Sequence, residues 1–273
     1  LLMVNLINVM NMKNFLYNLL LGGTLTFGVA SCMEVDNFDA PSECLTGSII
    51  DVTTGQNILA DQAEARVRIW EKSYSLNPSP QDIPVKQDGT YNNTKLFAGT
   101  YDVVAEGPWW PVDTLRNVPV GGKVTRNFEV TPYLKITDFS AILDGDTLRV
   151  EGRLAAPPIP SYNADRGDVM PQIMDVRCFI SSIQFCGNAN HLDAYYNLEV
   201  NKVKKTVINV RKAWSNISDG VEGSDGLTHS KDTYKFAVWA KPGYTFFVRM
   251  GARVDDTFQM YNYSDIVKIE VPQ

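Results

Sequence analysis

Alternation of apolar and polar residues is the dominant pattern along the chain from about residue 42 onward. Segment 45–51 reads Leu-Thr-Gly-Ser-Ile-Ile-Asp, and in segment 66–70 two aliphatic residues alternate with two arginines and a tryptophan. Successive side chains of a strand point to opposite faces, so this period of two predicts strands with one buried face. Turn residues at 54–55 and 88–89 separate the runs. We therefore expect about seven short strands, packed as a β-sandwich, over residues 42–131.

The second half of the chain shows the same period of two. No stretch has the spacing of an amphipathic helix, and no Gly/Ser-rich linker separates the halves at 131–134. We therefore expect an all-β fold in which a second sandwich, over 132–273, is stiffly joined to the first. Its strands are predicted at 147–154, 173–181, 195–200, 206–212, 234–240, 244–254 and 266–271.

The first 31 residues have the pattern of an export signal. From Met12 the chain has a lysine, then the uncharged apolar run 15–30, and then Cys32 at the end of Val-Ala-Ser-Cys. This order is that of a signal peptide, and the last four residues resemble a bacterial lipobox. The resemblance implies that Cys32 carries lipid. Residues 1–11 begin with Leu and look like an overextended reading frame, so we expect Met3 or Met12 as the start. A transmembrane anchor is the alternative, although the run is short and contains three glycines.

Residues 32–41 are predicted to form a short acidic tether. Glu34, Asp36 and Asp39 resemble the export signal that sends lipoproteins of Bacteroidetes-type bacteria to the outer face of the outer membrane. A merely polar tether is the alternative.

Residues at turns and strand starts in the first half carry a family resemblance. These residues are Gly47, Asp51, Thr54-Gly55, Asp88-Gly89-Thr90-Tyr91 and Gly99-Thr100-Tyr101. They occur in the order seen in carboxypeptidase regulatory-like domains, and they resemble those of the transthyretin (prealbumin) type. The resemblance implies a scaffold or binding module without a catalytic group.

The second half resembles a fibronectin type III or immunoglobulin-like sandwich, most clearly in its last run, 263–271. With the lipobox and the junction 130–134, the chain as a whole resembles uncharacterised two-domain lipoproteins of Bacteroidetes glycan-utilisation loci. That resemblance implies an outward-facing outer-membrane protein. Its implied partners are the outer-membrane glycan transporter, a substrate-binding lipoprotein and a polysaccharide or oligosaccharide.

Composition and motifs argue against several classes of function. The net charge is −6 and no cluster of Lys and Arg forms a basic stripe, which disfavours nucleic acid. The chain has two histidines, no Cys/His cluster, no nucleophile elbow and no phosphate-binding loop. We therefore expect no metal, no cofactor and no enzyme activity. Paired carboxylates of a glycoside hydrolase leave no linear signature, so that alternative stays open.

Three cysteines, Cys44, Cys178 and Cys186, remain once Cys32 carries lipid. An odd number cannot pair fully, and Cys178 and Cys186 would bridge only if the chain turned between them. We expect buried free thiols.

Aromatic residues supply the candidate binding chemistry, because their flat apolar faces suit sugar rings. Prolines flank Trp109-Trp110, which favours a presented loop, and two adjacent side chains of an extended segment cannot both point inward. We expect these rings to stack on glycan or, alternatively, to pack between the domains. Trp214, Tyr195 and Tyr196 are further candidate glycan contacts. The leading hypothesis is a non-enzymatic protein that binds carbohydrate or docks to the importer, and the alternative is a spacer or adhesin-like subunit that contacts protein alone.

Overall fold

The computed structural model describes residues 40–62, 64–200, 203–216, 221–222, 228–229 and 233–273. The predicted signal segment, Cys32 and nearly all of the tether therefore lie outside the described residues. No helix in the described part of the chain combines the length and apolarity needed to cross a bilayer.

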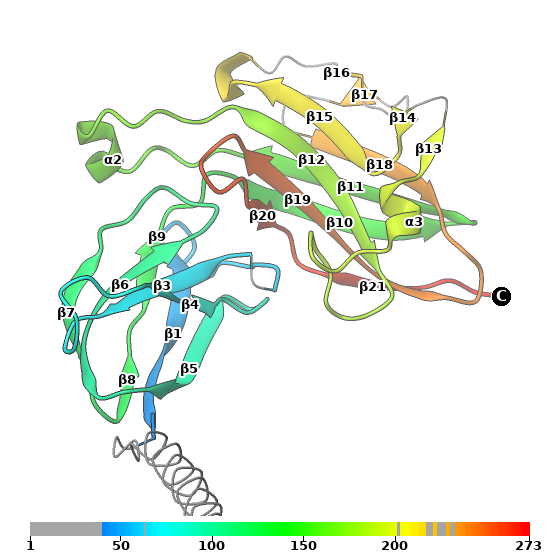
Figure 1. The fold of residues 1–273 in the computed structure, drawn as a ribbon. Helices are drawn as coiled ribbons and strands as arrows, with labels where there is room; N and C mark the ends of the chain where they lie inside the picture. Colours follow the sequence, from blue (N-terminus) through cyan, green and yellow to red (C-terminus); the bar gives the residue numbers. More distant parts are fainter. Residues whose placement is uncertain (1–39, 63, 201–202, 217–220, 223–227, 230–232) are drawn as a thin grey trace, which may run out of the picture. The chain divides into compact units, whose positions relative to one another are not determined.

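The N-terminal sandwich consists of two sheets (Figure 1). In the first, β1 is central: it pairs with β2 and β5 antiparallel and with β8 and β9 in parallel. The second has the order β4-β3-β6-β7 and is antiparallel throughout. The strands are β1 (Glu43–Asp51), β2 (Gln56–Asn57), β3 (Arg66–Glu71), β4 (Gln81–Pro84), β5 (Thr90–Leu96), β6 (Gly99–Glu106), β7 (Leu115–Val120), β8 (Lys123–Thr125) and β9 (Phe128–Val130).

Alternating residues of these strands form the N-terminal core, as the period of two requires. Leu45 and Ile49 of β1 are fully buried. Gly47 lies between them because a Cβ there would come within 1.7 Å of the Arg126 carbonyl oxygen and 2.9 Å of the Tyr91 ring. The Tyr91 hydroxyl donates to that same carbonyl at 2.5 Å. Gly47 and Tyr91, both part of the family resemblance, thus have a structural role.

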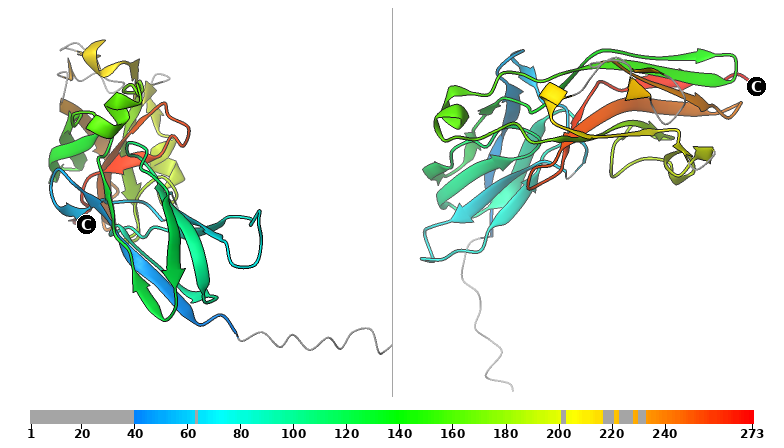
Figure 2. Two further views of the ribbon diagram at one scale, coloured as in Figure 1. Left: turned by 90° about the vertical axis from the view of Figure 1, so that its left-hand side faces the viewer. Right: turned by 90° about the horizontal axis from the view of Figure 1, so that it is seen from above.

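The C-terminal sandwich is also built from two sheets, with orders β10-β11-β18 and β15-β12-β19-β20, and β21 pairs with β19. Figure 2 shows by its colours that the chain completes the first sandwich before it builds the second. The elements are β10 (Lys135–Asp144), β11 (Thr147–Ala155), α2 (Ser161–Asp165), β12 (Ile173–Ser181), α3 (Asp193–Tyr196), β13 (Glu199–Val200), β14 (Val203–Lys204), β15 (Val207–Lys212), η2 (Trp214–Asn216), β16 (Val221–Glu222), β17 (Thr228–His229), β18 (Thr233–Trp239), β19 (Thr245–Val254), β20 (Tyr261–Tyr263) and β21 (Val267–Glu270).

The predicted all-β fold of two tandem sandwiches is confirmed, and most of the predicted strands of the second half are present. The strand predicted over 195–200 is wrong in its first part. The amides of Tyr195 and Tyr196 both donate to the Leu192 carbonyl, at 3.0 Å each, and close the single turn of α3. Only Glu199–Val200 is extended.

Strand β10 was not predicted, because its alternation is broken. Asp138 has a positive φ of 52°, and the pairing of β10 with β11 shifts register between Thr137 and Ser140. A bulge of this kind moves later side chains to the other face and hides the period of two.

The cysteines follow the expectation in part. Cys178 and Cys186 are free and buried, whereas Cys44 is free but only partly buried. Burial raises the pKa of the Cys186 thiol to about 12.

Candidate functional site

The two adjacent tryptophans lie in two different cores. Trp109 belongs to the N-terminal core and Trp110 to the C-terminal core, and each is 2% exposed. The segment is extended: Trp109 forms a β-bridge with Pro132, and the Trp110 amide donates to the Thr131 carbonyl at 3.0 Å. Adjacent side chains of an extended segment point in opposite directions, and here each direction leads into a hydrophobic core.

The prediction that Trp109 and Trp110 stack on sugar is therefore wrong for this structure, because neither ring offers a free face. Each ring is instead part of the core of one sandwich, Trp109 of the N-terminal and Trp110 of the C-terminal one. Gly107 makes room for this arrangement, since a Cβ there would come within 2.2 Å of the Trp109 ring.

The other three candidates are partly buried. Trp214 packs against the C-terminal core. The Tyr195 ring meets Phe246 edge to face at a centroid distance of 5.4 Å. The Tyr196 hydroxyl accepts a hydrogen bond from Arg177 at 2.6 Å. These contacts hold α3 and η2 in place, and a glycan contact at Trp214, Tyr195 or Tyr196 stays a prediction.

A buried polar cluster joins the two sandwiches instead. Asp61, in the segment before β3, is fully buried and accepts hydrogen bonds from the backbone amides of Gln62, at 2.7 Å, and Ala189, at 2.5 Å. Gly187 packs directly against it, because a Cβ there would come within 2.6 Å of the Asp61 carboxyl carbon. A buried carboxylate is tolerated when backbone amides donate to it.

Arg249 of β19 is the second member of this cluster. It is fully buried and donates to three carbonyl oxygens: those of Ala60 at 2.9 Å, Cys186 at 3.0 Å and Ser264 at 2.9 Å. The Ala60 carbonyl belongs to the first sandwich and the other two to the second. The guanidinium also lies 4.1 Å from the centroid of the Tyr263 ring, a cation–π distance.

Glu64 is the third member. Its carboxylate accepts hydrogen bonds from the Tyr263 hydroxyl at 2.5 Å and from the Tyr261 amide at 3.1 Å. Burial raises the pKa of Glu64 from 4.5 to about 7, although both hydrogen bonds act in the opposite direction.

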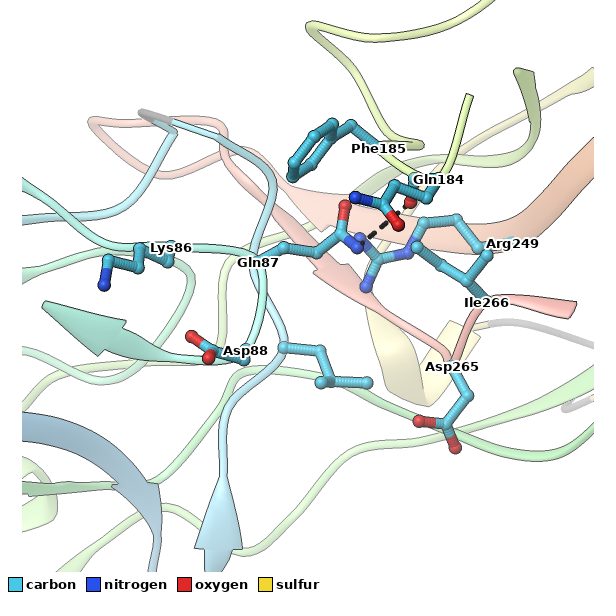
Figure 3. A pocket seen from close by; sticks show the side chains of 9 residues that line it. Lys86, Gln87, Asp88, Gln184, Phe185, Arg249, Asp265 and Ile266 are labelled. Atoms are coloured by element: carbon cyan, nitrogen blue, oxygen red, sulfur yellow. Dashed lines mark hydrogen bonds between the residues drawn. The ribbon is translucent and has the colours of Figure 1, made fainter. Parts of the chain in front are cut away.

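A pocket of about 440 Å³ opens beside this cluster (Figure 3). The N-terminal sandwich contributes Leu59 and the turn that precedes β5, and the C-terminal sandwich contributes the loop after β12, Arg249 and the segment before β21. Its volume lies within the range typical of small-ligand sites. Lining residues are Leu59, Lys86, Gln87, Asp88, Gln184, Phe185, Arg249, Asp265 and Ile266.

The pocket combines an aromatic face with hydrogen-bonding groups of both kinds. Phe185 is 41% exposed, and Lys86, Asp88 and Asp265 are exposed. A hydrogen bond from the Thr90 hydroxyl, at 2.7 Å, lowers the pKa of Asp88, so this carboxylate is an acceptor at neutral pH. Ammonium groups can donate to ligand hydroxyls, carboxylates can accept from them, and an aromatic ring can pack against an apolar ligand face.

The floor of the pocket is fixed by the amide of Gln87. Its nitrogen donates to the Gln184 carbonyl at 3.2 Å, and its oxygen accepts from the Cys186 amide at 3.3 Å. The loop that presents Phe185 is thereby tied to the N-terminal sandwich.

Sequence reasoning missed this pocket. Asp88 was identified as a turn residue, but Phe185 and Gln184 lie in a turn-rich stretch without a motif. The pocket is recognised by an exposed phenylalanine that lies opposite a charged turn. These residues are far apart in the sequence, so only the folded structure shows that they are neighbours. Within the described residues, no group of three or more His, Cys, Asp or Glu side chains is arranged to hold a metal.

Comparison with solved structures shows the fold of the chain. A DUF3823 family protein from Bacteroides uniformis is 23% identical with a TM-score of 0.67, and one from Parabacteroides merdae is 20% identical with a TM-score of 0.57. A B. uniformis protein named "putative carbohydrate binding protein" is 20% identical with a TM-score of 0.64. Each comparison covers 85% of this chain and 100% of the other chain.

No curated protein matches the chain. Residues 43–131 match the family model described as the N-terminal domain of a protein of unknown function, DUF3823. The expected resemblance to an uncharacterised family is thereby confirmed. Residues 43–131 are therefore similar to the N-terminal domain of a family whose function is unknown.

Proposed function

We propose that the protein binds carbohydrate without chemical conversion, at the pocket between its two sandwiches. The observation that carries this proposal is the exposed ring of Phe185 beside Lys86, Asp88 and Asp265. Sugars present apolar ring faces and hydroxyl edges, and this pocket offers a partner for each. The name of the B. uniformis structure, which covers 85% of this chain, points to the same class of ligand.

The setting of this function is the cell surface. The lipobox at Cys32 and the acidic residues after it support a lipid-anchored protein of the outer membrane that faces outward. In that position an outer-membrane glycan transporter and a substrate-binding lipoprotein are its proposed neighbours. Lipidation is tested by metabolic labelling with a radioactive fatty acid: the label enters the parent protein and is absent from Cys32→Ser.

A glycan array probed with the chain from residue 40 onward is the first test of the proposed ligand class. We expect binding to one or a few glycan families, with loss of signal when soluble competitor is added. Hydrolysis is tested on the same glycans by product analysis. Release of shorter products would show that the protein is a hydrolase and not a non-enzymatic binding protein.

A second candidate function is a rigid spacer that contacts only protein. The buried Asp61 and Arg249 favour it, because both fix one sandwich against the other. A spacer binds no glycan on the array but retains the transporter proteins in a pull-down from outer membranes.

A further inference from the structure

A second groove lies on the solvent face of the sheet β4-β3-β6-β7. In β3, Val67 and Ile69 point into the N-terminal core, so Trp70, the next residue, lies on the opposite face, where it is partly exposed. Trp70 is paired in register with Asp102 of β6. The groove has a volume of about 390 Å³, and its polar and aromatic lining includes Trp70, Lys72, Asn77, Asp102, Thr114 and Arg116.

Asp102 holds Arg116 at the edge of this groove. One carboxylate oxygen accepts from the Arg116 guanidinium at 2.9 Å, and the other accepts from the Asn117 amide at 3.0 Å. Asn117 has a positive φ of 54°, and the β6–β7 register shifts between Tyr101 and Val103. The Asp102 carboxylate therefore lies at a β-bulge.

These contacts use both carboxylate oxygens of Asp102. The Asn117 amide and the Arg116 guanidinium lower the pKa of Asp102, which is therefore ionised at neutral pH. Asp102 is 6% exposed, whereas the Arg116 side chain is 70% exposed. The ion pair uses one terminal nitrogen of the guanidinium, and the remaining N–H groups of Arg116 are available to a ligand.

Lys72 adds a second cation. It is exposed, and among the residues that the structure describes no carboxylate lies within ion-pair distance of its ammonium group. The groove thus has two cations and one carboxylate, and that carboxylate is buried and already paired. This local positive balance contrasts with the net charge of −6 of the whole chain.

We propose that this groove, the Trp70 groove, binds a glycan residue that carries an anionic group, either a carboxylate or a sulfate. The indole of Trp70 stacks on the sugar ring, and Lys72 and Arg116 pair with the anionic group. Asn77 and Thr114 supply hydrogen bonds to hydroxyls. Two cations around one aromatic ring match a single charged sugar and not the run of phosphates that a nucleic acid presents.

The inference shares with the proposed function the premise that the ligand is a saccharide, but its observations are independent of the Phe185 pocket. It names a second site and the chemical class of its ligand. The two sites are separated experimentally by variants that each touch one of them.

The test is calorimetric titration of the chain from residue 40 onward with three probes: an oligogalacturonide, the corresponding neutral galactose oligosaccharide and a sulfated oligosaccharide of similar length. We expect one or both anionic probes to bind at least about tenfold more tightly than the neutral one, a difference of about 1.4 kcal/mol. Binding should weaken as salt rises, because exposed charges are screened. The preferred anionic probe identifies the carboxylate or the sulfate.

Lys72→Gln is the decisive variant, because Lys72 is exposed and the fold should survive its replacement. It should weaken anionic binding about fivefold to tenfold, and Trp70→Ala should abolish it. Arg149→Gln is the control for the loss of one exposed positive charge, because its side chain is exposed but lies in β11 of the C-terminal sandwich. Phe185→Ala should leave anionic binding unchanged.

Equal affinity for charged and neutral probes, or full affinity in Lys72→Gln, would overturn the inference. So would failure of both anionic probes to bind at all. Loss of anionic binding in Phe185→Ala would assign the ligand to the other pocket and remove the Trp70 groove while leaving the proposed function intact. If anionic probes bind but no glycan binds at Phe185, the Trp70 groove is supported and the carbohydrate site proposed at Phe185 is contradicted.

Discussion

The Tyr263 hydroxyl of β20 donates a 2.5 Å hydrogen bond to the carboxylate of Glu64, and this contact spans the junction of the two sandwiches. Glu64 precedes β3 in the first sandwich, and Tyr263 lies in the second. Together with Asp61 and Arg249, the pair fixes the relative position of the surfaces that line the Phe185 pocket. The stability of this junction and the shape of the pocket are therefore coupled.

Glu64 should make the stability of the protein depend on pH. Its pKa is about 7 in the folded protein and 4.5 ordinarily, so between these values the folded state holds a proton that the unfolded state has lost. The contribution of Glu64 to the free energy of unfolding is therefore largest below about pH 4.5, and it is lost as pH rises through 7. At about 1.4 kcal/mol per pKa unit, the loss is on the order of 3 kcal/mol. Urea unfolding from pH 5 to pH 8 measures it.

Glu64→Gln should flatten this part of the pH profile, because the amide cannot ionise. Glu129→Gln, at an exposed position of β9, is the control and should keep the parental slope. An unchanged slope in Glu64→Gln would mean that another group titrates at the junction.

Arg249→Leu should destabilise the chain by about 3 kcal/mol or more. The replacement leaves the carbonyl oxygens of Ala60, Cys186 and Ser264 without their donor inside the junction, and each unsatisfied buried acceptor costs about 1 to 3 kcal/mol. Chemical unfolding followed by fluorescence gives the value. Arg149→Leu, at an exposed ion pair, should change it by less than about 1 kcal/mol.

Gly107→Ala should be destabilising by about 1 to 3 kcal/mol, because the new methyl group would overlap the Trp109 ring. Gly121→Ala is the matched control: a Cβ at Gly121 meets no atom within 4 Å. The comparison of their unfolding midpoints isolates the packing of Trp109. Equal midpoints would show that the Trp109 ring moves aside at little cost.

A thiol reagent should label only Cys44 in the folded chain from residue 40 onward. Burial raises the pKa of the Cys178 and Cys186 thiols, so neither supplies an accessible thiolate at neutral pH. Labelling in native buffer should therefore stop at one thiol per chain and vanish in Cys44→Ser. Three thiols should react in denaturant, and fast native labelling of a second thiol would contradict the described packing.

Much of the fold follows from local sequence, because alternation specifies which face of a strand is buried. The pattern around Val67 and Ile69 predicts β3 correctly. It fails for β10, where the bulge at Asp138 shifts the period, and for Tyr195, whose backbone closes a helical turn. Both failures come from local backbone geometry that residue types alone do not encode.

The candidate site was less predictable, because it depends on pairs of residues far apart in the sequence. The prolines around Trp109 and Trp110 correctly indicated an extended segment, but not that a hydrophobic core would lie on each side of it. The exposed ring turned out to be Phe185, and only the approach of the Lys86–Asp88 turn from the other sandwich makes a pocket beside it.

The most direct test of the account is calorimetric titration of Phe185→Ala with the glycan that binds best on the array. The ring of Phe185 is 41% exposed, and Phe97, which is 44% exposed between β5 and β6, gives a matched control in Phe97→Ala. We expect the affinity to fall at least about tenfold in Phe185→Ala, which corresponds to about 1.4 kcal/mol, and to be unchanged in Phe97→Ala. Parental affinity in Phe185→Ala would contradict the assignment of the inter-sandwich pocket as the carbohydrate site.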